Sequence, residues 1–168
     1  HVAWDDVLEG EGNGAAEKFL ATGAQAAAFV ADVSDFAQAQ DVAKEIVGQY
    51  RSINVLLNNA GIGSSNCLLE ISEAEWDRTI DINLKSCFNW SRAVVPSMQD
   101  RGSGRIISIS SIAAFSGGTA SKLAYAASKA GLLGMMRSLA KELGPSITVN
   151  AICPGTIKTA LTSKALAN

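Results

Sequence analysis

Short apolar runs alternate with longer helical patterns along this chain. The runs at residues 2–4, 27–30, 54–57, 105–109 and 148–152 have the length and composition of strands. Helical patterns lie between them, at residues 14–21, from Ser34 to about residue 50, from Ser72 to about residue 98, and at 124–143. Strands and helices that alternate at this spacing predict βαβ units, and therefore a parallel sheet with helices on both faces.

Several helix ends carry cap signals. Ser34 is the predicted N-cap of the second helix, and Ser72 with Glu75 forms a predicted capping box at the start of the third. Gly23 and Gly144 are the predicted stops of the first and last helices. The strand runs at 54–57 and 105–109 are nearly continuous in apolar residues, which is typical of strands covered on both faces.

Polar residues and glycines follow the carboxyl ends of the predicted strands. They are Asp6, Asp32, Asn58, Ser111 and the pair Pro154-Gly155. In open parallel sheets, ligands bind beyond the carboxyl ends of the strands. The sequence therefore predicts a binding site at this edge.

Tyr125 and Lys129 lie four residues apart on the last predicted helix, so both side chains fall on one face. A free phenol titrates near pH 10. An ammonium within about 4 Å attracts the phenolate by roughly 4 kcal/mol at an effective dielectric of about 20, which corresponds to about 3 pK units. Such a phenol can exchange a proton with an alcohol near neutral pH. Taken alone, the pair is a weak signal, and an ordinary surface helix is the better explanation for it.

Composition limits the classes of function. The 168 residues suffice for one domain, and 48% hydrophobic with 18% charged residues is typical of a globular chain. A net charge of −2 without a basic stripe argues against nucleic-acid binding. No apolar run approaches the ~18 residues of a membrane helix, so we expect a soluble protein. Its cysteines, Cys67, Cys87 and Cys153, are typical of reduced thiols in a cytoplasmic protein. The single histidine, His1, gives no reason to expect a metal site.

The motifs together resemble the short-chain dehydrogenase/reductase family, from His1 to about Leu161. The matching segments are Asn58-Asn59-Ala60-Gly61, Asn83 within its helix, Ser111, the pair Tyr125 and Lys129, and Pro154 to Thr159. The resemblance implies a Rossmann-type doubly wound α/β fold. The family's glycine-rich phosphate turn would precede His1, and its substrate segment would follow Asn168. The chain starts without methionine and stops inside a helical pattern, so we expect a partial NAD-binding and catalytic domain over 1–168, truncated at both ends.

The resemblance also implies a nicotinamide cofactor. Asp6 would accept hydrogen bonds from the adenosine ribose and repel a 2′-phosphate, which favours NAD over NADP; the adjacent Asp5 is the alternative. Asp32 and Val33 would meet the adenine, although Asp32 could also belong to the start of the next helix. The other cofactor-binding residues implied are Asn58, Ala60, Gly61, Tyr125, Lys129, Pro154, Gly155, Ile157 and Thr159. An ordinary turn is the structural alternative for the segment from Asn58 to Gly61.

Four residues would carry the chemistry. Tyr125 would exchange the proton, and Lys129 would lower the pKa of the phenol and bind the nicotinamide ribose. Ser111 would donate a hydrogen bond to the substrate oxygen. Ser110 is the alternative, and its side chain should point to the opposite side of the strand end. Asn83 would hold a water that relays protons from Lys129, or would be a structural amide.

The expected reaction is the interconversion of a secondary alcohol and a ketone, or of 3-hydroxyacyl and 3-oxoacyl groups. A small-molecule substrate and a homodimer or homotetramer are the expected partners, with an interface formed by the helical patterns at 73–98 and 124–143. A non-catalytic NAD-binding sensor is the main alternative. A serine hydrolase built on Ser138 and Lys141 is disfavoured, because that pattern lies inside a helix and the only histidine is terminal.

Overall fold

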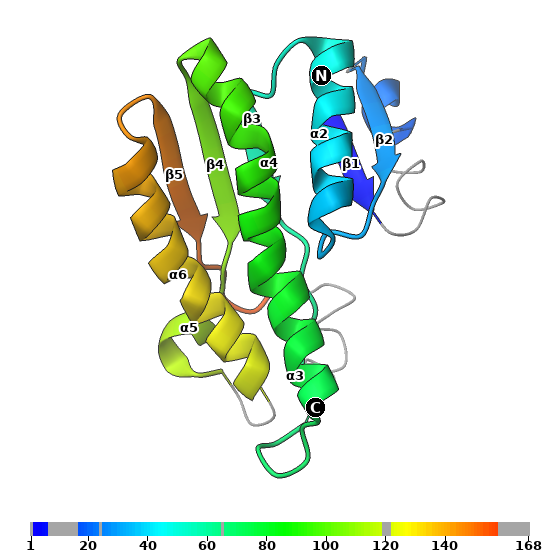
Figure 1. Ribbon diagram of the computed structural model, residues 1–168. Helices are drawn as coiled ribbons and strands as arrows, with labels where there is room; N and C mark the ends of the chain where they lie inside the picture. The colour runs from blue at the N-terminus through cyan, green and yellow to red at the C-terminus, as the bar shows by residue number, and fades with distance from the viewer. Residues whose placement is uncertain (1, 7–16, 24, 65, 119–121, 158–168) are drawn as a thin grey trace.

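The strands form two parallel sets (Figure 1). The computed structural model describes residues 2–6, 17–23, 25–64, 66–118 and 122–157, with the side chains of 2–6 excepted. One set pairs β1 (Val2–Asp6) with β2 (Ala26–Val30), and the other has the order β3 (Val55–Asn58), β4 (Gly104–Ile109), β5 (Ile147–Ile152). The general doubly wound sheet has the strand order 3-2-1-4-5-6. The pair β2-β1 of this chain matches the first two places of that order, and the set β3-β4-β5 matches the last three.

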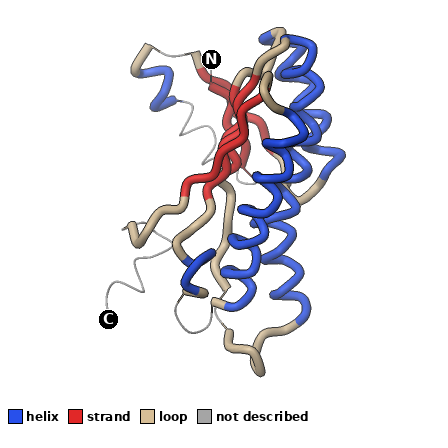
Figure 2. The backbone as a smooth tube through the Cα atoms, turned by 90° about the vertical axis from the view of Figure 1, so that its left-hand side faces the viewer, coloured by secondary structure: helices blue, strands red, loops and turns tan. Residues whose placement is uncertain are grey.

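Helices lie on both sides of the strands. Figure 2 shows α2 (Phe36–Tyr50), α4 (Ser86–Arg101) and α6 (Leu123–Leu143) on one face, and a short helix at residues 17–21 on the other. The predicted doubly wound α/β class is therefore confirmed. Within the described ranges, no helix has the length and apolarity that a bilayer-spanning segment requires.

The core lies between the strands and the α2, α4 and α6 layer. Ile106 and Ser108 of β4 are fully buried, whereas Arg105, which alternates with them on the other face of the strand, is exposed. A Cβ on Gly104 would lie 2.4 Å from the Met98 Sδ, so α4 packs directly on the start of β4. The central buried cluster comprises Phe29, Val42, Ile53, Trp90, Val94, Met98, Ile106, Met136 and Ile147, with Ala31, Ala39 and Ala43.

Coverage of β3 differs from the prediction. Val55 and Leu57 are 48% and 55% exposed, because they alternate with the buried positions and lie on the other face of the strand. Asn58 is buried and Leu56 packs against the core. The prediction that this strand is covered on both faces is thus wrong for the described residues.

Of the two predicted N-caps, one is correct and one is wrong. Ser72 caps α3 (Glu73–Ile80), since its Oγ accepts from the Glu75 N–H at 3.1 Å, as predicted. The N-cap of α2 is Asp35 rather than Ser34, and its carboxylate accepts from the backbone N–H groups of residues 37 and 38. Ser34 lies one residue before this cap, and its hydroxyl is turned to the Asp32 carboxylate, to which it donates.

The long helix predicted from Ser72 to about residue 98 is interrupted by a π-helical turn. This turn, η1 (Asp81–Lys85), separates α3 from α4, and the Ser86 N–H donates to the Asp81 carbonyl five residues back. Such turns are frequent at functional sites. A further short helix, α5 (Ala113–Ser116), was not predicted.

The apolar surface of α6 is largely used within the chain itself. Leu132 and Met136 are buried, and the same core is contacted by Met135, Leu139 and Leu143. The predicted surplus of apolar surface on this helix is therefore smaller than the sequence indicated. Large exposed apolar side chains nearby are Phe88 on α4, Phe115 on α5 and Leu123 at the start of α6.

Candidate active site

Tyr125 and Lys129 lie side by side where α6 passes the carboxyl end of β4. Lys129 is only 4% exposed, and its Nζ donates to the Ile109 carbonyl at 2.7 Å. The same Nζ lies 5.8 Å from the centroid of the Tyr125 ring. Burial lowers the pKa of Lys129 from its usual range. The structure therefore holds an ammonium at a fixed position beside a half-buried phenol.

Asn83 connects the loop after β3 to α6. Its Oδ1 accepts from the Ile62 N–H at 2.7 Å, and its Nδ2 donates to the Ile62 carbonyl at 2.9 Å. The Nδ2 also donates to the Ser128 Oγ at 3.0 Å, and the Ser128 hydroxyl donates to the Tyr125 carbonyl at 2.7 Å. Asn83 is fully buried in η1, so these bonds are shielded from water. This side chain ties both the loop and the tyrosine turn to one helix.

Gly61 is the point where the loop meets the lysine. A Cβ at this position would lie 3.3 Å from both the Asn83 Oδ1 and the Lys129 Nζ, tighter than nearly all real contacts. The loop can approach these two polar groups because glycine has no side chain. Ala60 and Gly61 are exposed, so the edge they form is accessible to a ligand.

Asn58 turns inward instead. It is 8% exposed, and its Nδ2 donates to the Ser108 Oγ of the neighbouring strand at 3.1 Å. The Ser108 hydroxyl contacts the Met136 Sδ at 3.2 Å. The Asn58 amide thus links β3, β4 and α6, whereas the accessible part of the motif is Ala60 and Gly61.

Ser110 and Ser111 point in different directions, as predicted. Ser110 is buried and donates to the Lys129 carbonyl at 2.8 Å. Ser111 is half-buried, and its Oγ accepts from the Ala113 N–H at 3.1 Å. Ser110 therefore anchors the α6 backbone, and Ser111 is the hydroxyl that a substrate can reach.

The segment after β5 runs beside Ser111. The Ser110 N–H donates to the Ile152 carbonyl at 2.8 Å, and the Ile112 N–H donates to the Pro154 carbonyl at 3.0 Å. These bonds bring Pro154 and Gly155 next to Ser111, while Ile157 is 58% exposed. Thr159 lies outside the described residues.

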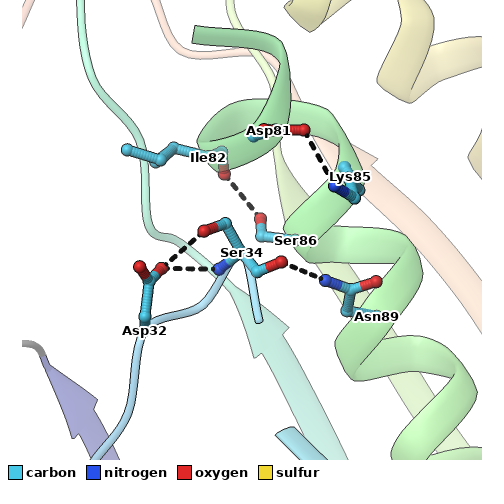
Figure 3. A network of polar contacts seen from close by, with 7 residues as sticks. All are labelled: Asp32, Ser34, Asp81, Ile82, Lys85, Ser86 and Asn89. Carbon is cyan, nitrogen blue, oxygen red and sulfur yellow. Dashed lines mark hydrogen bonds and ion pairs between the residues drawn. The ribbon is translucent and has the colours of Figure 1, made fainter. Parts of the chain in front are cut away.

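A second group of predicted residues lies at the carboxyl end of β2 (Figure 3). The Asp32 Oδ1 accepts from the hydroxyl of Ser34 at 2.7 Å and from its N–H at 2.9 Å. These two bonds, the hydroxyl one first, lower the pKa of Asp32, so the exposed carboxylate stays ionised. The Ser34 carbonyl accepts from the Asn89 Nδ2 at 2.9 Å, which fastens this turn to α4. Val33 within the turn is half-buried.

Asp6 ends β1 opposite Val30. The backbone pairing therefore places Asp6 at the same carboxyl edge as Asp32, two residues beyond Val30. The side chains of Asp5 and Asp6 lie outside the described part of the structure, so the choice between them stays a prediction.

Sequence reasoning missed several supporting residues. Ser64 and Ser128 are each at most 1% exposed, and each bonds the first turns of α6. Ser110, predicted only as the alternative to Ser111, bonds the same helix. Cys87 is also buried, which raises the pKa of its thiol, and its Sγ lies 3.6 Å from the Asn83 carbonyl. Only Ser128 carried a sequence signal, since it lies within the Tyr125–Lys129 turn.

The site places the Lys129 ammonium beside the Tyr125 phenol, with the Ser111 hydroxyl on the segment that follows β4. No three His, Cys, Asp or Glu side chains gather into a metal site within the described ranges. The open glycine edge at Gly61, the ammonium beneath it and the ionised Asp32 suit a dinucleotide that lies across the strand ends. These side chains can position a substrate and move a proton, and a nicotinamide would supply the redox step.

Comparison with known proteins gives the same picture. A family model described as short chain dehydrogenase matches residues 1–168. The 3-oxoacyl-acyl-carrier-protein reductase FabG of Thermotoga maritima is 42% identical over 137 residues, covering 81% of this chain and 55% of the relative. The protein of the same name from Staphylococcus epidermidis is 40% identical over 148 residues, covering 88% and 60%. The chain thus spans little more than half the length of these relatives.

Solved structures agree in fold. A protein described as an NAD(P)-dependent gluconate 5-dehydrogenase from Beutenbergia cavernae, solved with NADP at low occupancy, matches with a TM-score of 0.92 and 37% identity, covering 100% of this chain and 67% of that one. A gluconate 5-dehydrogenase from Burkholderia cenocepacia, solved with NADP and tartrate, matches with a TM-score of 0.93 and 27% identity, covering 99% and 65%. Because the family model matches residues 1–168, this chain belongs to the short-chain dehydrogenase family.

Proposed function

We propose that this chain forms the cofactor-binding and catalytic part of an oxidoreductase that interconverts a secondary alcohol and a ketone. The observation that carries the proposal is the buried Lys129 ammonium, which the Ile109 carbonyl holds beside the Tyr125 ring. A surface helix with an incidental tyrosine and lysine would not bury the lysine.

Each polar side chain has a role in this reaction. In the reducing direction, Tyr125 gives the proton of its hydroxyl to the substrate oxygen, and in the oxidising direction it accepts that proton. Ser111 donates a hydrogen bond to the same oxygen, on which negative charge develops. Lys129 stabilises charge on the phenol, and Asn83 holds the loop and the tyrosine turn in register.

A nicotinamide cofactor supplies or accepts the hydride when it is bound. Ala60, Gly61, Asp32 and Val33 would hold its adenosine half, and Lys129, Pro154, Gly155, Ile157 and Thr159 would hold its nicotinamide half. Asn58 would contribute to that surface through its backbone, because its side-chain amide is bonded to Ser108.

NAD is the proposed cofactor, with NADP as the competing possibility. A carboxylate at Asp6 would repel the 2′-phosphate of NADP, and it lies at the carboxyl edge that the dinucleotide would cross. Against this, two structural neighbours, 37% and 27% identical, were solved with NADP. The two cofactors must therefore be compared directly.

The substrate proposed first is a 3-oxoacyl thioester, because the curated relatives at 40–42% identity are named 3-oxoacyl reductases. A sugar acid is second, since two structural neighbours are named gluconate 5-dehydrogenases. A small-molecule substrate and a homodimer or homotetramer complete the proposal.

The test uses the full-length protein with NADH or NADPH and two substrates, acetoacetyl thioester and 5-ketogluconate. Consumption of the reduced cofactor that depends on either ketone supports the proposal. Cofactor binding by calorimetry without turnover of any ketone would favour the non-catalytic sensor. Absence of both would refute the assignment of this site.

A further inference from the structure

Within the described residues, helix α6 starts without a side-chain cap from the positions next to it. The first N–H groups of a helix have no partner within the helix. Lys122 occupies the N-cap position with φ −117 and ψ 21, and its side chain makes no capping bond. The helix that carries Tyr125 therefore needs an acceptor from elsewhere.

Ser64 supplies that acceptor from the loop after β3. Its Oγ accepts from the Tyr125 N–H at 3.3 Å, across 61 residues of sequence. Tyr125 is the third residue of α6, and the third N–H is one that a local serine cap would bond. Ser64 is 1% exposed, so water does not compete for this bond.

A second bond joins the same two segments, again with the helix start as donor and Ser64 as acceptor. The Lys122 Nζ donates to the Ser64 carbonyl at 3.2 Å. The start of α6 thus donates two hydrogen bonds to one residue of the loop. Two residues earlier, Ile62 is fixed by Asn83. The loop is therefore held between η1 and the first turn of α6.

We propose that Ser64 is a positioning residue for Tyr125, which it holds by capping α6 from the cofactor-side loop. This inference rests on the proposed function, because it concerns the residue that moves the proton. Without the cap, the first turn of α6 frays and the phenol loses its fixed place beside Lys129. The same loop carries Gly61, but its neighbour Ile62 is held separately by Asn83, so the cofactor edge keeps its support when the cap is lost.

The test compares Ser64→Ala and Ser64→Thr in the full-length protein, with Ser72→Ala as the matched control. Ser72 also caps a helix through its hydroxyl, with a bond of 3.1 Å to a third N–H, but on α3. We expect kcat of Ser64→Ala to fall about 3- to 30-fold, the range to which ~0.5–2 kcal/mol of capping energy converts. Cofactor Kd should stay within about twofold, and Ser64→Thr and Ser72→Ala should keep at least about half of the wild-type kcat.

Amide hydrogen exchange at Tyr125 provides the readout that activity alone cannot. It should accelerate in Ser64→Ala and not in Ser72→Ala. If Ser64→Ala does not fold, Lys122→Met replaces it, with Lys122→Arg as the variant that restores the bond. A wild-type kcat in Ser64→Ala, or an equal loss in Ser72→Ala, overturns the positioning role. A wild-type protein without any turnover refutes the proposed function instead.

Discussion

Replacing Asn83 should destabilise the protein far more than replacing a comparable buried asparagine. Asn83 makes three hydrogen bonds, two to Ile62 and one to Ser128, and is fully buried. Asn89 lies on the adjoining helix at 2% exposure and makes one bond, to the Ser34 carbonyl. Both side chains have the same size, so the cavity left by alanine is similar.

The difference in stability follows from the number of bonds. Each buried partner left without its hydrogen bond costs about 1–3 kcal/mol. Asn83→Ala breaks three such bonds, but Ile62 is only half-buried and the Ser128 hydroxyl keeps its bond to Tyr125. The free energy of unfolding should therefore fall by about 3–6 kcal/mol, the lower part of the range for three such bonds, whereas Asn89→Ala should lower it by about 1–3 kcal/mol. Since whole domains are stable by only about 5–15 kcal/mol, the first change approaches the limit of folding.

The assay is urea unfolding of the full-length protein, followed by circular dichroism, for the wild type and both variants. Asn83→Asp is a useful third variant, because it keeps the acceptor for the Ile62 N–H and loses both donor bonds. It should fall between the other two. Equal losses for Asn83→Ala and Asn89→Ala would refute the view that Asn83 holds the site together.

Three further predictions concern Lys129, the cofactor and assembly. Burial lowers the pKa of Lys129 in the folded protein. Between that lowered pKa and about 10.4, the ordinary pKa of lysine, the unfolded chain therefore binds more protons than the folded one. The free energy of unfolding of the wild type should therefore rise with pH, relative to Lys129→Met, as the pH increases toward about 10.4; a constant difference in urea titrations would contradict this. If Asp6 selects the cofactor, kcat/KM should favour NADH over NADPH by at least about tenfold, or ~1.4 kcal/mol, and equal use would disprove the selection. The exposed side chains Phe88 and Phe115 should be covered in a dimer or tetramer, so light scattering should not give a monomeric mass at micromolar concentration.

The sequence predicted most of the fold because its signals are local. Strand 105–109 differs from β4 by one residue, and the helix at 124–143 differs from α6 by one. Apolar runs and glycine stops depend only on residues close together in the sequence, so they can be recognised without the structure. The capping serine at Ser72 is local in the same sense, since its partner is three residues away.

The features that the sequence did not predict depend on distant residues. The π-helical turn at Asp81–Lys85 coincides with bonds from Asn83 to Ile62, which lies 21 residues away. Ser64 caps a helix that starts far along the chain, and no pattern around it indicates this. Ser34 looked like a cap, but the competing bond to Asp32 could be recognised only from the geometry of the turn.

The central claim is that the phenol of Tyr125, held beside the Lys129 ammonium, moves the proton in a redox reaction. Tyr125→Phe removes only the hydroxyl and keeps the ring, so folding and cofactor binding should be unchanged. The measurement is single-turnover oxidation or reduction by the full-length protein, with cofactor affinity determined in parallel. We predict that the rate falls by at least about 10²-fold, the low end of what general acid–base catalysis supplies, at unchanged cofactor Kd. A Tyr125→Phe protein that retains near-normal turnover would contradict the catalytic role of this site.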